Sequence, residues 1–152
     1  MGATAFPTPL IPRVQDDQRL YTDLFFVANI PFLLTLSKPL EHLMTTLLDG
    51  KDTASLRKVL KRHLNFYGQR RINVTHLYCD NERGISALEP DLAAAGITLV
   101  NSGPSMHVHV AERSIRYIKE GARSVLAGLP YQCPRTMFKM LLPFVALRLN
   151  LL

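Results

Sequence analysis

The stretch Ile72-Asn73-Val74-Thr75-His76-Leu77-Tyr78-Cys79-Asp80-Asn81 decides the fold. Its apolar, β-branched and aromatic side chains predict a strand over residues 72–79. Asp80 then stands at the tip of this strand, and Gly84 separates it from a helical pattern that opens at Ile85. An Asp after a strand most often serves as a turn residue or a helix cap. The same place suits a metal ligand, because the strand fixes the position of the carboxylate.

Three further strands are predicted upstream. Residues 20–29, 32–36 and about 42–48 are aromatic or apolar, and Asn29-Ile30-Pro31 can turn the chain between the first two. A helix over residues 43–48 is an alternative for the third. Because the links between these strands are short, we expect an antiparallel meander.

Helical periodicity dominates the rest of the chain. A helix begins after Asp52 or Thr53 and ends at Gly68. Its apolar face recurs every three or four residues: Leu56, Val59, Leu60, His63, Leu64 and Tyr67. The later elements are a helix over 85–95 closed by Gly96, a strand over 97–100, a helix from 107–110 to 127 and a helix over 135–152. This order predicts an α/β fold with a five-stranded mixed sheet, an antiparallel meander plus β-α-β units, and helices on both faces.

Composition narrows the class of partner. The net charge of +6 and the pI of about 9.6 suit a polyanion, nucleic acid first and an acidic membrane surface second. Cys79 and Cys133 are the only cysteines, so the sequence contains no disulfide framework and a reducing compartment is expected. No charge-free apolar run is long enough to span a bilayer, and no secretory signal is recognisable.

The two ends of the sequence suggest a piece of a longer polypeptide. Residues 1–18 contain three prolines before a polar stretch, which predicts an irregular tail or linker remnant. Residues 19–152 form the expected domain, and this domain stops while the chain is still apolar.

Three carboxylates are candidates for a metal site. Asp23 lies within the first strand, Asp80 ends the fourth, and Glu112 lies at the start of the long helix. If the first and fourth strands are parallel neighbours, all three can reach one edge of the sheet. Converging carboxylates repel one another when they are ionised, so full ionisation is disfavoured without a cation nearby. Their hard oxygen atoms suit Mg²⁺ or Mn²⁺. Two such ions support in-line phosphoryl transfer.

The residues around these carboxylates carry a family resemblance. They are Tyr21-Thr22-Asp23-Leu24-Phe25-Phe26, Cys79-Asp80-Asn81, Val110-Ala111-Glu112-Arg113 continuing through Ile115-Arg116-Tyr117-Ile118-Lys119-Glu120, and the Leu129-Pro130 break. Over residues 19–152 the chain resembles the catalytic core of retroviral and retrotransposon integrases, which has a ribonuclease H-like fold. It looks closest to the integrases of Copia-like long-terminal-repeat elements.

Two features depart from the family pattern. Only 31 residues (112 − 80 − 1) separate Asp80 from Glu112, slightly fewer than is usual in the family. Glu82 stands where many relatives have Gly directly after Asp-Asn, and the Gly of this chain arrives at position 84. The turn after Asp80 is therefore expected to be built differently.

The resemblance implies an enzyme of DNA integration that trims the 3′ ends of element DNA and joins them to target DNA. It implies that Asp23, Asp80 and Glu112 are the catalytic residues and hold two Mg²⁺ or Mn²⁺ ions. Asn81 would support the site, and the loop over residues 102–107 would close over DNA. The implied partners are element and target DNA. The chain is also expected to form a homodimer or higher oligomer, and no membrane partner is expected. The implied location is the nucleus of a eukaryotic host.

Basic residues extend from Glu112 along one face of the long helix. Arg116, Lys119 and Arg123 follow it at i+4, i+7 and i+11. On spacing alone, this is a solvated face with Glu112–Arg116 and Arg116–Glu120 pairs worth about 0.3–0.5 kcal/mol each. The resemblance favours DNA contact for Arg116 and Lys119, and both interpretations stay open for Arg123.

Other candidate residues have structural explanations. His107 and His109 are a possible metal pair, but they more simply belong to a loop or helix start. His63 is expected to be buried and hydrogen-bonded, and Cys79 to be a core residue. Four cations of the first helix are expected to be a solvated face: Arg57, Lys58, Lys61 and Arg62.

Two alternatives to an active integrase remain. One is a catalytically inactive or domesticated remnant that keeps the fold and binds nucleic acid without turnover, since neither a zinc module nor a second DNA-binding domain is recognisable in the sequence. The other is a ribonuclease H-like nuclease that acts on hybrids and shares the metal chemistry.

Overall fold

The computed structural model describes residues 16–80, 83–102 and 108–151. The elements in chain order are β1 (Gln18–Val27), β2 (Ile30–Lys38), β3 (Leu43–Leu47), α1 (Thr53–Gln69), β4 (Val74–Asp80), α2 (Arg83–Ser86), α3 (Glu89–Ala94), β5 (Thr98–Ser102), α4 (Val108–Gly128) and α5 (Arg135–Leu149). The third stretch is a strand, so the helical alternative for residues 43–48 is wrong.

The five strands form one mixed sheet in the order β3-β2-β1-β4-β5. The first three strands pair antiparallel, which confirms the predicted meander. β4 runs parallel to β1, and β5 runs parallel to β4. The central strand β1 therefore has the meander on one side and the β-α-β part on the other.

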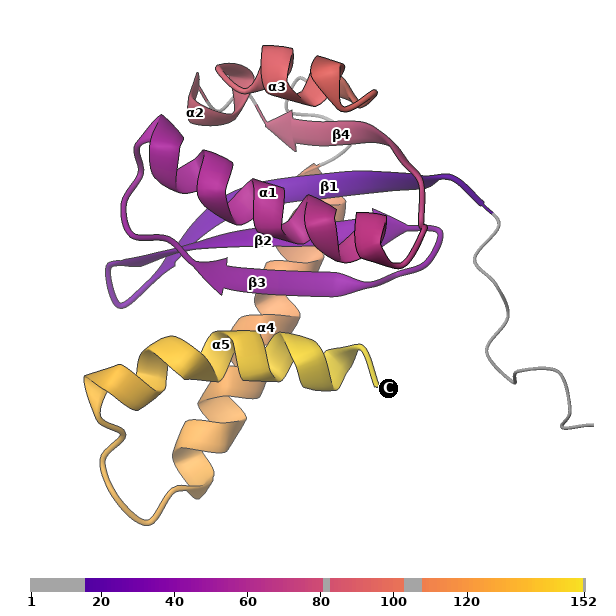
Figure 1. Ribbon diagram of the computed structural model, residues 1–152. Helices are drawn as coiled ribbons and strands as arrows, with labels where there is room; N and C mark the ends of the chain where they lie inside the picture. The colour runs from indigo at the N-terminus through magenta and orange to yellow at the C-terminus, as the bar shows by residue number, and fades with distance from the viewer. Residues whose placement is uncertain (1–15, 81–82, 103–107, 152) are drawn as a thin grey trace, which may run out of the picture.

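Helices cover both faces of the sheet, as predicted, and Figure 1 shows α1 and α4 on opposite sides of it. The core between the sheet and α1, α2 and α3 includes Leu20, Leu33, Leu56, Leu60, Leu77, Ile85 and Leu92. The core between the other face and α4 and α5 includes Phe25, Phe32, Leu34, Ile118, Ala122 and Leu142. Because successive strand residues point to opposite faces, β1 contributes to both cores.

The helix predicted over residues 85–95 is two short helices. Pro90 lies in the first turn of α3, where a missing N–H costs nothing, but the same residue cannot continue a helix from α2. Leu88 N instead donates to Ile85 O at 2.9 Å, which closes a tight turn between the helices. Gly96, with φ of +78°, ends α3 as predicted.

Strand boundaries differ from prediction by one or two residues, and at the starts of β4 and β5 the cause is a neighbouring turn that takes up backbone groups. Ile72 N donates to Tyr67 O at 3.0 Å and completes the end of α1, so β4 begins only at Val74. Ile97 N donates to Leu92 O at 2.8 Å and completes the end of α3, so β5 begins at Thr98.

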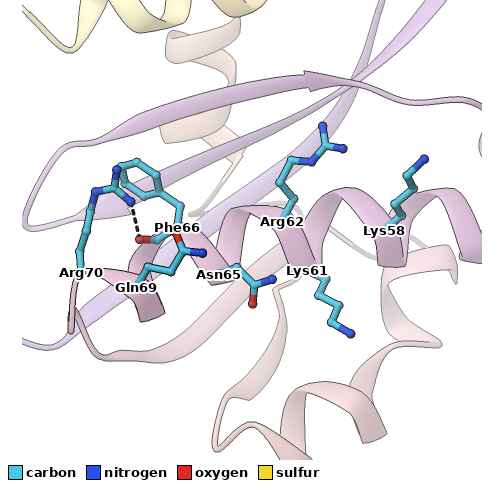
Figure 2. Close-up of a pocket in the computed structure, with 7 residues that line it drawn as sticks. All are labelled: Lys58, Lys61, Arg62, Asn65, Phe66, Gln69 and Arg70. Atoms are coloured by element: carbon cyan, nitrogen blue, oxygen red, sulfur yellow. Dashed lines mark hydrogen bonds between the residues drawn. The ribbon is translucent and has the colours of Figure 1, made fainter.

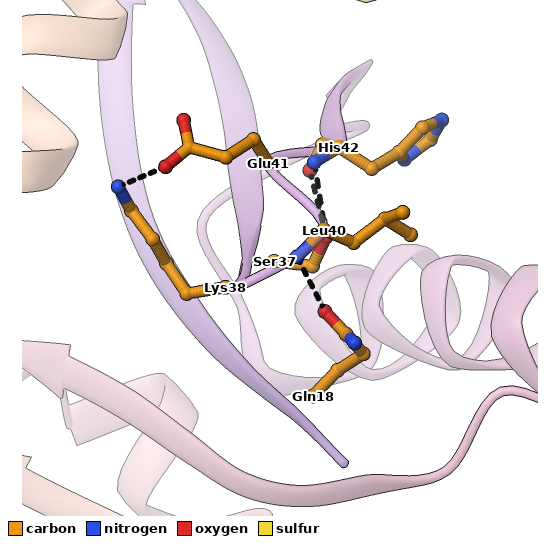
Figure 3. Close-up of polar contacts among 6 residues, drawn as sticks. All are labelled: Gln18, Ser37, Lys38, Leu40, Glu41 and His42. Atoms are coloured by element: carbon orange, nitrogen blue, oxygen red, sulfur yellow. Dashed lines mark hydrogen bonds and ion pairs between the residues drawn. The ribbon is translucent and has the colours of Figure 1, made fainter. Parts of the chain in front are cut away.

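The connection between β2 and β3 is anchored by the first residue of β1 (Figure 3). Gln18 is fully buried, and its Oε1 accepts from Leu40 N at 2.9 Å. Ser37 Oγ accepts from His42 N at 3.0 Å within the same turn. The chain is therefore regular from Gln18 onward, whereas the sequence pattern placed residue 18 in the irregular tail.

Asn150 occupies the edge of β3. Its Oδ1 accepts from Leu43 N at 2.7 Å and its Nδ2 donates to Leu43 O at 2.7 Å. The side-chain amide thus pairs with an edge strand as a neighbouring backbone would. The predicted helix over 135–152 ends earlier, at Leu149. Within the described residues, no helix is long and apolar enough to cross a membrane.

Candidate active site

Asp23 lies on the central strand and points toward the α4 face of the sheet. Its register partner on β2 is Leu34, which belongs to the core under α4. Residues directly opposite one another on antiparallel strands project to the same face, so Asp23 shares that face. The carboxylate is half-buried, and its Oδ1 accepts from Leu24 N at 2.8 Å.

Asp80 ends β4 beside Asp23. Parallel register pairs Tyr21 with Tyr78 and Thr22 with Cys79, and Asp23 and Asp80 are the next residue on each strand. The tyrosine rings stack with centroids 5.0 Å apart, which places both on one face. Since side chains alternate along a strand, Asp23 and Asp80 lie on that same face, on strands about 4.8 Å apart.

The end of β4 is tied to the rest of the sheet. Cys79 is buried, and its Sγ donates to Asn101 Oδ1 at 3.0 Å. The same oxygen accepts from Ser86 Oγ at 3.3 Å, so one Asn links β4, β5 and α2. The expectation that Cys79 is a core residue is confirmed, and its bond to Asn101 fixes the strand end that carries Asp80.

Glu112 lies near the start of the helix that covers the face of the two aspartates. Ala111 and Ile118 of α4 are buried in the core that contains Phe25 and Leu34, whereas Glu112 is exposed. Within residues 16–80, 83–102 and 108–151, no three His, Cys, Asp or Glu side chains lie close enough together to hold one metal ion. The structure therefore brings two of the predicted carboxylates to one edge and leaves the third on the adjacent helix.

Some predicted site residues lie outside the described part of the chain. These are Asn81, residues 103–107 of the predicted closing loop, and His107 of the possible metal pair. His109 is described and is exposed.

The basic stripe on α4 faces solvent. Arg116 and Arg123 are exposed, and Lys119 is half-buried. Lys119 and Arg123 line a shallow groove of about 250 Å³ that also includes Phe26 and Val27 of β1. The ion pairs of the described residues, Lys38–Glu41, Arg57–Asp91 and Lys58–Asp49, include none of these side chains. The Glu112–Arg116 and Arg116–Glu120 pairs of the alternative interpretation are therefore not formed in the described chain.

His63 is buried under the sheet, as predicted. Its Nδ1 lies 2.7 Å from Thr35 Oγ1 and its Nε2 lies 2.7 Å from Thr46 Oγ1. Burial, and then the charges of Arg62 and His42, lower the pKa of His63 to about 4. The ring is thus a neutral bridge between β2, β3 and α1, and it is remote from the face that carries the aspartates.

Sequence reasoning missed a groove on the outer face of α1. The expected exposure of Arg57, Lys58, Lys61 and Arg62 is confirmed. Three of these cations line a groove together with residues that follow them: Lys58, Lys61, Arg62, Asn65, Phe66, Gln69 and Arg70. The signal available in the sequence was the absence of acidic residues from this helix together with Arg70 and Arg71 directly after it.

The sheet order, the parallel β1–β4 pair and the helices on both faces define the ribonuclease H-like fold of integrase catalytic cores. A solved structure with this fold is the catalytic core domain of BIV integrase, which matches with a TM-score of 0.71 and 15% sequence identity. The match covers 89% of this chain and 84% of that one. No family model matches the sequence, and no curated protein matches it either.

Proposed function

We propose that this chain is the catalytic core of an integrase that transfers polynucleotide ends into target DNA. The observation that carries the proposal is the placement of Asp23 and Asp80 next to one another on parallel strands and on one face. The likeness in fold to the catalytic core domain of BIV integrase supports it. The Copia-like subtype, assembly as a dimer or higher oligomer and action in the nucleus belong to the same proposal.

The two aspartates fit a divalent metal ion in their chemistry and position. Both offer hard carboxylate oxygens of the kind that Mg²⁺ and Mn²⁺ prefer, and they enter from neighbouring strands. Glu112 would complete the ligand set from α4. When bound, such ions activate the attacking hydroxyl and stabilise the leaving oxygen of a phosphodiester.

The role proposed for α4 is to hold the DNA backbone beside this edge. Arg116, Lys119 and Arg123 follow Glu112 on one stripe and enter none of the ion pairs of the described chain. Cations outside such ion pairs are available to phosphates, and contacts of this kind orient DNA without reading its sequence. The stripe thus gives the substrate a direction of approach toward the carboxylates.

A second candidate function is a nucleic-acid-binding remnant without turnover. It is favoured by the finding that no three potential metal ligands are grouped within the described residues. This candidate keeps the fold and the basic surfaces and predicts that substitution of Asp80 leaves DNA binding and stability unchanged.

The test is the reversal of strand transfer on a branched DNA substrate in the presence of Mn²⁺, a reaction simple enough for an isolated core. We expect the parent chain to resolve the branch and Asp80→Asn to fall to background. Asp91→Asn is the matched control, because Asp91 is an exposed aspartate whose partner is Arg57.

Each outcome of this test separates the candidates. A parent chain with no activity would overturn the integrase proposal in favour of the remnant. Equal activity of Asp80→Asn and the parent would place the chemistry elsewhere. Preferential cleavage of an RNA–DNA hybrid would favour the ribonuclease H-like nuclease.

A further inference from the structure

The whole excess positive charge of the protein is concentrated on one helix and its end. Residues 53–71 contain six of the 18 Lys and Arg residues and none of the 12 Asp and Glu residues. The other 133 residues (152 − 19) therefore carry 12 basic and 12 acidic side chains and are formally neutral. The net charge of +6 has a definite location, which is α1 and the two arginines that follow it.

Three cations of α1 and Arg70 after it line a groove of about 500 Å³, and we call it the α1 groove (Figure 2). Its lining residues are Lys58, Lys61, Arg62, Asn65, Phe66, Gln69 and Arg70. Lys61, Arg62 and Arg70 belong to none of the ion pairs of the described chain, whereas Lys58 has an exposed partner in Asp49 at 3.5 Å. Asn65 and Gln69 add exposed amides that can donate hydrogen bonds.

Arg70 is held in place at the end of the groove. Its Nη1 donates to Phe66 O at 3.0 Å, and its guanidinium carbon lies 3.7 Å from the centre of the Phe66 ring. The ring of His42 also stacks on Phe66, with centroids 4.7 Å apart. Because Phe66 is already engaged by Arg70 and His42, a nucleotide base gains little by stacking there, and the groove offers charge and hydrogen-bond donors instead.

The spacing along the groove suits a phosphate backbone. Lys58 and Gln69 are 11 residues apart, which is about 16 Å along a helix. The phosphates of one DNA strand advance about 3.4 Å per step along the axis, so the stripe spans roughly five steps. Three cations, Lys58, Lys61 and Arg62, lie within about one turn at one end of this length, and Arg70 lies just beyond its other end. The groove can therefore neutralise phosphates at both ends, while the neutral amides between them donate hydrogen bonds.

We propose that the α1 groove is a second nucleic-acid surface, which binds the phosphate backbone of a double helix without reading its sequence. This second surface goes beyond the proposed function, which places DNA beside α4, because α1 and α4 cover opposite faces of the sheet (Figure 1). DNA in the α1 groove is therefore a different segment from DNA beside Asp23 and Asp80. The groove gives the core a hold on nucleic acid that is independent of metal and of the carboxylates.

The test measures binding of the whole chain to a labelled duplex of about 20 base pairs by fluorescence anisotropy, with EDTA present, between 50 and 200 mM salt. The variant is Lys61→Gln with Arg62→Gln, both exposed. The control is Arg135→Gln with Lys139→Gln on α5, which removes the same charge elsewhere. Thermal unfolding checks that both variants remain folded.

We expect the α1 variant to bind the duplex at least tenfold more weakly at 50 mM salt and the slope of log K against log salt to shrink by about 2. The control should keep the slope of the parent. Equal losses in both variants would overturn the proposal, because net charge alone would then explain binding. The proposal would also be overturned if the parent did not bind the duplex. It would be overturned as well if the α1 variant lost binding to phosphatidylserine vesicles but still bound the duplex.

This result is separable from that of the proposed function. EDTA removes metal from the assay, so an inactive carboxylate site does not change the outcome. Arg116→Gln with Lys119→Gln tests the α4 stripe in parallel, and additive changes in slope in the combined variant are expected for two separate surfaces.

Discussion

Tyr21 and Tyr78 stack with ring centroids 5.0 Å apart and an interplanar angle of 13°, two residues before Asp23 and Asp80 on the same two strands. The stacked pair thus supports the face of the sheet that carries the two aspartates. Because the two rings lie on the face that carries Asp23 and Asp80, we expect their contact to help hold these strand ends together.

We predict that the two tyrosines are energetically coupled. A double-mutant cycle with Tyr21→Leu and Tyr78→Leu should give a coupling free energy of about 0.5–1.5 kcal/mol, the range for aromatic pairs. Urea unfolding of the four proteins measures it. Additive effects of the two substitutions, within about 0.3 kcal/mol, would show that the stacking does not support this edge.

A second prediction concerns acid stability. The pKa of His63 is about 4 in the folded chain because of burial and the nearby charges of Arg62 and His42, against an ordinary value of 6.5. The unfolded chain therefore binds the proton more readily, so stability is complete above pH 6.5 and falls as the pH drops toward 4. The full loss is roughly 3 kcal/mol. Burial and Arg70 also lower the pKa of His42, which adds to the loss in the same direction.

Urea unfolding at pH 7 and at pH 4.5 tests this prediction with His63→Gln, which cannot titrate. The variant should be less stable than the parent at pH 7, because the bridge from Thr35 to Thr46 is altered. Its stability should change less between the two pH values. An equally steep decline in parent and variant would assign the acid sensitivity to other groups.

A third prediction uses two helical glycines. A Cβ on Gly121 would lie 2.7 Å from Val145 Cγ1, so α4 and α5 approach closely at this position. Gly121→Ala should destabilise the fold by about 1–2 kcal/mol through overpacking, even after the gain in helix propensity. Gly68→Ala on α1 is the matched control, because nothing lies within 4 Å of its added Cβ.

Gly68→Ala should stabilise the chain by up to about 1 kcal/mol. Thermal or urea unfolding of the two variants gives the comparison. A gain in stability for Gly121→Ala would mean that α4 and α5 are packed more loosely than the contact with Val145 indicates.

Local patterns were sufficient to predict the order and type of most elements. The aromatic and apolar run of β1 and the apolar face of α1 from Leu56 to Tyr67 are local features of the sequence, so composition and periodicity reveal them. The break between α2 and α3 was missed, although Pro90 was visible, because the competing pattern of apolar residues was continuous. Element boundaries depended on turn hydrogen bonds, which periodicity does not report.

The candidate site was only partly predictable. Sequence placed Asp80 at a strand end, and the structure supplies the parallel partner that puts Asp23 beside it. That pairing joins residues far apart in the chain and cannot be derived from local propensity. The α1 groove was also hidden, because each of its cations looks like an ordinary exposed side chain until Arg70 and Phe66 are seen at its end.

The central claim is that Asp23 and Asp80 form one metal site, and calorimetric titration with Mg²⁺ or Mn²⁺ tests it most directly. Concentrations should reach millimolar, since two or three carboxylates without DNA hold these ions weakly. We predict a heat of binding for the parent and for Asp91→Asn, and its loss in both Asp23→Asn and Asp80→Asn. Binding that persists in either site variant, or no binding by the parent at millimolar metal, would contradict the claim.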